Sequence, residues 1–305
     1  GDQDLTTDGG SLSAASGAKV NASTFSGKLG LPESGDGDFD IDTDMSGGEF
    51  QLGTNDDVVD LTATDPANNL TVNGNGGTDV FKVADQGGLT ASDSPTVTDV
   101  DTFQINDGGA NTIDASKFTN VGELRFTDSS TNNNTQTVTN LPSDTTAIGL
   151  GSSSAALDTT STIDVSLANN TSSDSLAFAV NNSSGADSVN PDIVTSEIEK
   201  TTYNVADSGN DFMLDLSSSD ADTVEFTGGQ SGTDADIDGS TLNSATSKVD
   251  ASGFNGDLQV DASGANSAVT VLANEGDGNT KITTGSNGDT VTLNSVDGQA
   301  TTLAG

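Results

Sequence analysis

The chain has 305 residues, with 8 Lys and Arg against 47 Asp and Glu, a formal net charge of −39, and no Cys, His or Trp. This composition excludes disulfides, zinc sites of the Cys/His type and catalytic groups that depend on His or Cys, and the charge excludes nucleic-acid binding through a basic surface. The sequence contains no run of about 18 apolar residues, so we expect no insertion into a membrane.

Short runs of alternating apolar and polar residues predict β-strands along most of the chain. Such alternation, with Gly, Asn, Asp and Ser between the runs, is typical of half-buried strands joined by tight turns. In chain order the runs lie at 80–83, 102–105, 123–126, 163–167, 176–180, 223–226, 258–260 and 290–293. The segment Pro191–Lys200 is the nearest candidate for a helix. Low hydrophobicity with high charge is also typical of disorder, but the alternation predicts an ordered, almost all-β chain.

A six-residue motif recurs four times along the chain. It consists of an apolar residue, Asp or Asn, a small residue, Ser, any residue, and a second apolar residue. The copies lie at 20–25, 113–118, 237–242 and 249–254. The Asp, Asn and Ser side chains can accept hydrogen bonds from nearby backbone N–H groups. The motif therefore predicts a turn at the end of a strand, with both apolar residues pointing inward.

In a second motif, an Asp residue stands directly in front of a predicted strand. The residues are Asp57, Asp79, Asp187, Asp222 and Asp289. The two motifs are linked at similar spacing near both ends of the chain, because Asn21 and Asp57 are 36 residues apart and Asp250 and Asp289 are 39 apart. We therefore interpret 19–61 and 248–293 as diverged copies of one unit.

Repeats of about this length in an all-β chain rich in Gly, Asp and Asn predict a parallel β-solenoid of short strands, similar to a β-helix or β-roll. Each coil would bury one row of aliphatic residues against the next coil. Tandem β-sandwich domains are the alternative, because strands every 8–12 residues produce similar alternation. Under the solenoid prediction, 1–126 and 185–305 form its N- and C-terminal parts, and 127–184 is an irregular β segment rich in Ser, Thr and Asn.

The second motif resembles a degenerate form of the glycine-rich nonapeptide of calcium-binding β-rolls. The segments 73–81 and 285–291 match it best, although neither has the full glycine pattern. Ca²⁺ takes six to eight oxygen ligands and needs no His or Cys. We therefore predict Ca²⁺ as the cofactor, with Asp79 and Asp289 as the first candidate ligands, followed by Asp57, Asp222 and Asp187. In the alternative interpretation, each Asp only ends a loop before a strand.

Two further groups of Asp residues alternate with other residues, so that several carboxylates share one face of a strand. They occupy alternate positions of 36–44 and of 234–238. Like charges this close repel each other unless a cation bridges them. A solvated, charged edge that blocks aggregation is an equally good explanation.

The succession of these motifs resembles bacterial surface-layer proteins and the repeat-in-toxin-related β-solenoids of Gram-negative bacteria. The residues that carry the resemblance are Asp57-Val-Val-Asp-Leu, Gly-Gly-Thr-Asp79-Val-Phe, 97–105, 112–118 and 124–126, with a looser repetition at 196–205, 222–226 and 249–254. The resemblance covers about 19–126 and 185–293. It implies a secreted chain that binds Ca²⁺ and assembles into a two-dimensional lattice.

These features together predict a structural, extracellular protein of the cell surface that assembles with itself into a surface layer or a filament stabilised by Ca²⁺. A cell-surface polysaccharide is a second candidate partner. We expect no enzyme, because among 40 Asp residues any pair of carboxylates can be chosen and none is distinguished. The alternatives are a Ca²⁺-stiffened segment of a large bacterial adhesin and a halophilic protein. The excess of Asp over the 7 Glu argues against the halophilic protein.

Overall fold

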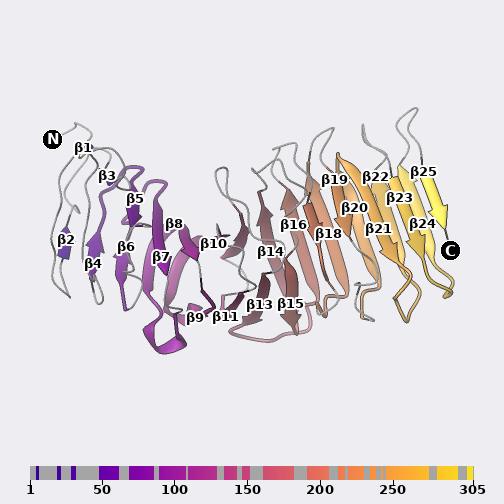
Figure 1. Cartoon of the computed structure of the whole chain (residues 1–305), viewed down its shortest axis with the longest axis horizontal. Helices are drawn as coiled ribbons and strands as arrows, with labels where there is room; N and C mark the ends of the chain where they lie inside the picture. The colour runs from indigo at the N-terminus through magenta and orange to yellow at the C-terminus, as the bar shows by residue number, and fades with distance from the viewer. Residues whose placement is uncertain are drawn as a thin grey trace. The chain divides into compact units, whose positions relative to one another are not determined.

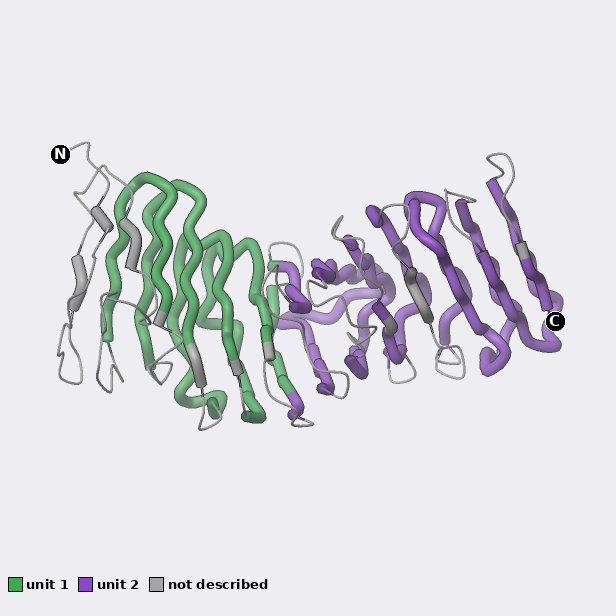
Figure 2. Tube along the Cα trace, turned by 45° about the horizontal axis from the view of Figure 1, so that its top comes forward, with its two compact units in different colours: residues 1–130, 136–146 green, residues 131–135, 147–305 purple. Residues whose placement is uncertain are grey.

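Parallel β-strands make up nearly all of the described structure (Figure 1). The computed structural model describes the following residues: 5–6, 19–21, 29–31, 48–61, 69–85, 89–107, 109–128, 134–142, 146–151, 161–181, 191–205, 212–216, 219–229, 234–237, 242, 245–274, 280–294 and 301–304. The chain divides into two compact units, unit 1 with residues 1–130 and 136–146, and unit 2 with residues 131–135 and 147–305 (Figure 2).

Unit 1 consists of parallel strands stacked coil upon coil. The main row has the order β1–β3–β5–β7–β8–β10, a second row has the order β2–β4–β6–β8, and β9 pairs with β11. The long strand β8 belongs to both of these rows, pairing with β6 through its first residues and with β7 through its last. The elements are β1 (Leu5–Thr6), β2 (Lys19–Asn21), β3 (Leu29–Leu31), β4 (Glu49–Gln51), β5 (Val58–Leu61), β6 (Thr71–Asn73), β7 (Val80–Asp85), the 3₁₀ turn η1 (Ala91–Asp93), β8 (Thr96–Asp107), β9 (Asn111–Asp114), the 3₁₀ turn η2 (Ala115–Lys117), β10 (Phe118–Asp128) and β11 (Thr135–Leu141).

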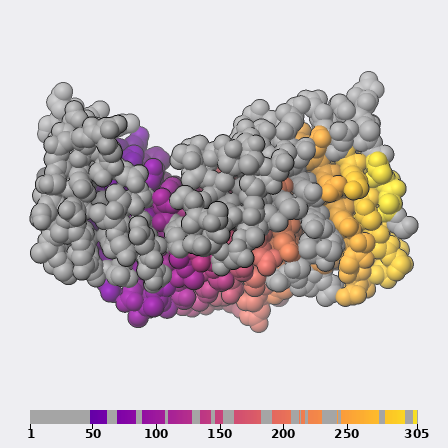
Figure 3. Space-filling view, in the orientation of Figure 1, coloured from indigo at the N-terminus to yellow at the C-terminus, as the bar shows by residue number. Residues whose placement is uncertain are grey.

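Unit 2 repeats this architecture. Its main row has the order β12–β14–β16–β18–β20–β22–β24, and two further rows have the orders β13–β15 and β17–β19–β21–β23–β25. Within each unit the described residues follow one another in chain order along the surface (Figure 3). The strands are β12 (Ala147–Leu150), β13 (Thr162–Leu167), β14 (Ser175–Val180), β15 (Asp192–Ser196), β16 (Lys200–Val205), β17 (Phe212–Leu214), β18 (Thr223–Gly228), β19 (Asp234–Ile237), β20 (Lys248–Phe254), β21 (Asp257–Ala262), β22 (Thr270–Asn274), β23 (Thr280–Thr284), β24 (Thr290–Asn294) and β25 (Thr301–Ala304).

The register of the strands sets the length of a coil. Val58 pairs with Val80, and Val80 pairs with Thr102, so two successive coils of unit 1 have the same length. In unit 2 the coils of the main row vary, from the short step between Thr270 and Thr290 to the longer step between Ile148 and Phe178. The predicted repeat unit 248–293 spans more than one coil, because the row from β20 to β24 passes through β22 and makes two turns.

The core lies inside the coils and follows the alternation of the strands. In β18 the burial alternates along Thr223–Gly228, so that Val224 and Phe226 are buried. The rings of Phe178, Tyr203 and Phe226 stack with centroids 4.9 and 5.1 Å apart. These distances are close to the spacing of neighbouring strands, because each coil contributes one ring at the same level.

The structure confirms the predicted all-β solenoid and rejects the sandwich alternative, because the described strands of both units pair in parallel and sandwiches are antiparallel. The helix candidate Pro191–Lys200 is wrong. Its residues Asp192–Ser196 form β15, which pairs with β13 and buries Ile193 and Thr195. Period-2 burial of β-branched residues against a neighbouring coil overrides the helical preference of the two Glu residues that follow. The division into 1–126, 127–184 and 185–305 stays a prediction.

Candidate functional site

Acidic residues recur at one corner of the coils, where the chain enters a strand of the main row. Asp101 lies inside β8 but occupies the equivalent position, because the following residue, Thr102, pairs with Val80 at the start of β7. We call these residues the acid column of each unit. The acid column consists of Asp57, Asp79 and Asp101 in unit 1, and of Asp174, Glu199, Asp222 and Asp289 in unit 2.

The acid column of unit 1 is a ladder of hydrogen bonds between successive coils. The backbone N–H of Asp57 donates to Oδ1 of Asp79 at 2.9 Å, and the N–H of Asp79 donates to Oδ2 of Asp101 at 2.8 Å. Asp57 itself accepts from the N–H of Gly53 at 2.7 Å. Each corner turns the backbone away from the strand ladder, so its N–H group needs another acceptor. A carboxylate one coil further along the chain supplies it.

Unit 2 uses the same device at two places. The N–H of Asp174 donates to Oε2 of Glu199 at 2.8 Å, and the N–H of Val269 donates to Oδ1 of Asp289 at 2.9 Å. These bonds support the interpretation in which the acidic residue in front of a strand serves the turn, because its carboxylate accepts a hydrogen bond from a backbone N–H group at the corner. A hydrogen bond from an N–H group to a carboxylate is about twice as strong as a neutral one, so the acid column contributes to the cohesion of the stack.

Asp79 differs from the other members of the acid column. Its side chain is fully buried, with 0% exposure, and within the described part of the chain its Oδ2 atom has no hydrogen-bond partner. Burial raises the pKa of Asp79 from 3.8 to about 7, against the lowering effect of the Asp57 N–H bond and with a further rise from the carboxylates of Asp57, Asp101 and Asp56. Gly74 makes room for this group, since a Cβ atom there would lie 2.5 Å from Oδ2 of Asp79.

The fit of a calcium ion at this corner can be judged from the oxygen atoms that it offers. Oδ2 of Asp79 is a buried, unused carboxylate oxygen, which is the kind of ligand that Ca²⁺ takes. Oδ2 of Asp57 and Oδ2 of Asp101 accept backbone N–H groups. Among the described residues, no three acidic side chains are placed to hold one ion. The corner therefore offers one anchoring oxygen without a complete coordination shell, and the calcium site stays a prediction.

Among the described residues, the structure brings together two of the predicted ligands, Asp57 and Asp79 on adjacent coils. Asp222 is exposed and its backbone carbonyl accepts from Ser247 and Lys248. Asp289 is partly exposed, and the coils that contain β20 and β22 separate it from Asp222. Asp187 lies outside the described residues, as does the group at 36–44. Of the group at 234–238, Asp234 and Asp236 belong to β19 and Asp238 is not described.

Sequence reasoning missed three members of the acid column, namely Asp101, Asp174 and Glu199. A signal was present for the first, because Asp57, Asp79 and Asp101 are equally spaced along the chain, at the length of one coil. Asp101 stands directly in front of the run at 102–105, but no glycine-containing turn precedes it, because β8 continues through it from Thr96 to Asp107. Asp174 and Glu199 were missed because no glycine-rich segment like that of the β-roll nonapeptide precedes them.

The six-residue turn motif is confirmed where the structure describes it. Asp114 accepts from the N–H of Ser116 at 3.1 Å, and Asp250 accepts from the N–H of Ser252 at 3.2 Å. Residues 22–25 and 238–241 of the other two copies lie outside the described residues. A fifth copy at 260–265 was missed because its last apolar residue is Ala. There Asp261 accepts from the N–H of Ser263 at 2.9 Å.

No known protein family, curated protein or solved structure matches the chain. The resemblance to surface-layer and repeat-in-toxin-related proteins therefore remains a prediction from the residues. The helices of the described part are the 3₁₀ turns η1 and η2, of three residues each, which are too short to span a membrane.

Proposed function

We propose that this protein is a structural, non-enzymatic component of a bacterial cell surface that assembles with copies of itself into a layer or filament. The observation that carries the proposal is the coil repeat. Each described coil pairs in parallel with its neighbour and points a row of apolar side chains inward, and many coils carry an Asp or Glu at the same corner. A coil without a following coil therefore presents a template for another one.

The coil of β24 and β25, the last one in the described structure, shows what such a coil presents. In the preceding coil Val271 and Ile282 are fully buried, with 0% exposure. At the equivalent places of the next coil Val291 is partly exposed and Leu303 is 56% exposed. Another coil laid on β24 and β25 would cover these side chains and extend both ladders. Burying apolar surface yields about 25 cal/mol per Å², which favours the addition.

The alternative function is a segment of a large adhesin. The same exposed coil supports it, because further coils of a longer chain would bury Leu303 equally well. In that case the isolated chain is a stiff monomer, and contacts run between neighbouring coils of one chain.

Calcium is the proposed stabilising cofactor. The buried, unused Oδ2 of Asp79 and the net charge of −39 support it, since cations lower the repulsion between copies of so acidic a chain. An extracellular location and a cell-surface polysaccharide as an additional partner belong to the same proposal and rest on the family resemblance.

Electron microscopy and light scattering of the protein, in millimolar Ca²⁺ and in chelator, test the proposal. We expect ordered assemblies in Ca²⁺ and smaller species in chelator. Leu303→Asp should reduce assembly, whereas Thr302→Asp, on the outward side of the same strand, should not. A monodisperse rod in Ca²⁺ supports the adhesin segment instead. Assemblies that persist in chelator contradict the calcium part alone.

A further inference from the structure

The outward side of the main row of unit 2 carries no net charge. The first, third and fifth residues of β14, β16, β18, β20, β22 and β24 are at least partly exposed, and they form what we call the balanced face. Six of its eighteen residues are Thr, three Asn, two Ser, two Ala and one Leu. The remaining four are Lys200, Glu225, Lys248 and Asp250, whose charges sum to zero in a chain of net charge −39.

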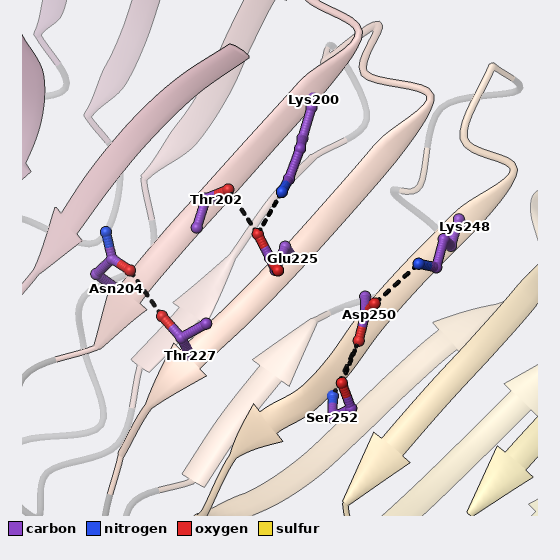
Figure 4. A network of polar contacts seen from close by, with 8 residues as sticks. All are labelled: Lys200, Thr202, Asn204, Glu225, Thr227, Lys248, Asp250 and Ser252. Atoms are coloured by element: carbon purple, nitrogen blue, oxygen red, sulfur yellow. Dashed lines mark hydrogen bonds and ion pairs between the residues drawn. The ribbon is translucent and has the colours of Figure 1, made fainter. Parts of the chain in front are cut away.

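The four charged residues lie on three neighbouring strands and form two ion pairs (Figure 4). Nζ of Lys200 lies 2.6 Å from Oε2 of Glu225 on the next coil, and Nζ of Lys248 lies 2.8 Å from Oδ2 of Asp250 on its own strand. Thr202 also donates to Glu225 at 3.0 Å. The lysine side chains remain 43% and 38% exposed. They can therefore turn toward a second surface without first being uncovered.

The charge of the whole chain determines which of its surfaces a second copy can approach. Two copies with a net charge of −39 repel each other, and the repulsion is smallest where the local charge is zero. In a two-fold arrangement the same patch serves both partners. The balanced face suits this arrangement, because the lysines of one copy can face Glu225 and Asp250 of the other.

We infer that a second copy of the chain docks on the balanced face, with Lys200 and Lys248 of each copy against Glu225 and Asp250 of the other. The inference rests on the proposed self-assembly and names one of its contact surfaces. This contact joins copies side to side, and it is independent of the addition of coils at β24 and β25.

The dimensions of the balanced face predict a weak contact. Six strands spaced by about 4.8 Å, with five residues of about 3.3 Å each, cover roughly 500 Å². A stable dimer buries about 800 Å² per partner. The contact should therefore form only at high protein concentration, or where many copies hold one another in place.

Sedimentation analysis over a wide concentration range, with a pair of charge-reversal variants, tests the inference. Lys200→Glu with Lys248→Glu makes the balanced face negative, and Glu225→Lys with Asp250→Lys makes it positive. We expect each double variant alone to associate about 100-fold more weakly than the wild type, because like charges then face each other. An equimolar mixture of the two should recover association. The control, Lys82→Glu with Lys281→Glu, changes the net charge by the same amount away from this face and should associate more strongly than Lys200→Glu with Lys248→Glu.

The outcomes separate this inference from the proposed function. If the wild type associates and the charge-reversal variants associate equally well, the docking surface is wrong and self-assembly stands. If the wild type is monomeric at every concentration with Ca²⁺ present, both fail. Correct folding of the variants can be verified by the fluorescence of Tyr203, the one tyrosine of the chain, which is fully buried beneath this face.

Discussion

Replacing Asp79 by Asn should change the pH dependence of stability of unit 1. Asn has nearly the same shape and can still accept the N–H of Asp57 through its oxygen, so the ladder of the acid column stays intact. It has no charge to bury beside Asp57 and Asp101. The substitution therefore isolates the cost of ionising a carboxyl group that is fully buried.

The magnitude follows from the pKa of Asp79, which burial raises from 3.8 to about 7. Between these pH values the folded chain keeps the proton and the unfolded chain releases it. The stabilisation is therefore complete below about pH 4 and is lost as the pH rises through about 7. At about 1.36 kcal/mol per pKa unit the upper bound is about 4 kcal/mol. Local rearrangement around the charged group reduces this cost, and we expect Asp79→Asn to gain about 2 kcal/mol over the wild type between pH 5 and pH 8.

Urea unfolding and hydrogen exchange in the presence of a chelator measure the effect. The amides of Val80 and Thr102 bond to the carbonyls of Asp57 and Asp79 and report on this corner directly. Asp289→Asn is the matched control, because Asp289 also accepts an N–H of the preceding coil but is partly exposed. A gain of stability confined to Asp79→Asn would assign the effect to burial of that carboxyl group.

Parallel losses of stability in Asp79→Asn and in the wild type between pH 5 and pH 8 would show that the Asp79 carboxyl group does not carry this pH dependence. A large loss of stability in the variant at pH 5 would show instead that the proton on Asp79 makes a bond that Asn cannot replace. Added Ca²⁺ extends the experiment. If the ion binds at Asp79, it should stabilise the wild type at pH 8 and leave the variant unchanged.

Three further substitutions test the packing of the coils. Tyr203→Phe removes a buried hydroxyl without a hydrogen-bond partner among the described residues. Urea unfolding should therefore show unchanged stability or a gain of up to about 1 kcal/mol. A loss above about 2 kcal/mol would show that this hydroxyl does make a hydrogen bond in the wild type. Phe81→Ala, in the ring stack of unit 1, should cost about 3–5 kcal/mol by the same assay, whereas Val58→Ala, at a side chain that is 42% exposed, should cost less than about 1 kcal/mol. Gly77→Ala should cost about 2 kcal/mol or more in thermal unfolding, because φ is +111° and a Cβ atom would lie 2.6 Å from a backbone oxygen. Gly288→Ala is the control, because a Cβ atom there meets nothing within 4 Å. Equal losses of stability in the two variants would contradict this expectation.

Local chemistry accounts for what could be predicted from the sequence. Thr223–Phe226 alternates because one face of its strand is buried, and this is visible without knowing what covers it. Asp114 and Asp250 form their turns with residues two positions away, so the six-residue motif carries the whole interaction. The strands and turns, and with them the all-β class, follow from such short-range patterns.

The coil length could not be obtained in the same way. Alternation shows which side chains point inward, but it does not show which strand lies next to which. The spacing between Asp250 and Asp289 therefore suggested one repeat, although the pairing of β20, β22 and β24 makes two turns of it.

The sequence by itself determined the strands, their turns and the large excess of Asp. Only the tertiary structure decided what individual charges do. Asp101 receives the N–H of Asp79 because the stack places them one coil apart, and Asp79 loses access to water because its neighbouring coils cover it. Lys200 and Glu225, on successive strands of the main row, become partners on a face without net charge. The physical reason is that burial and pairing of charges depend on distances between coils, which the register of the parallel strands sets.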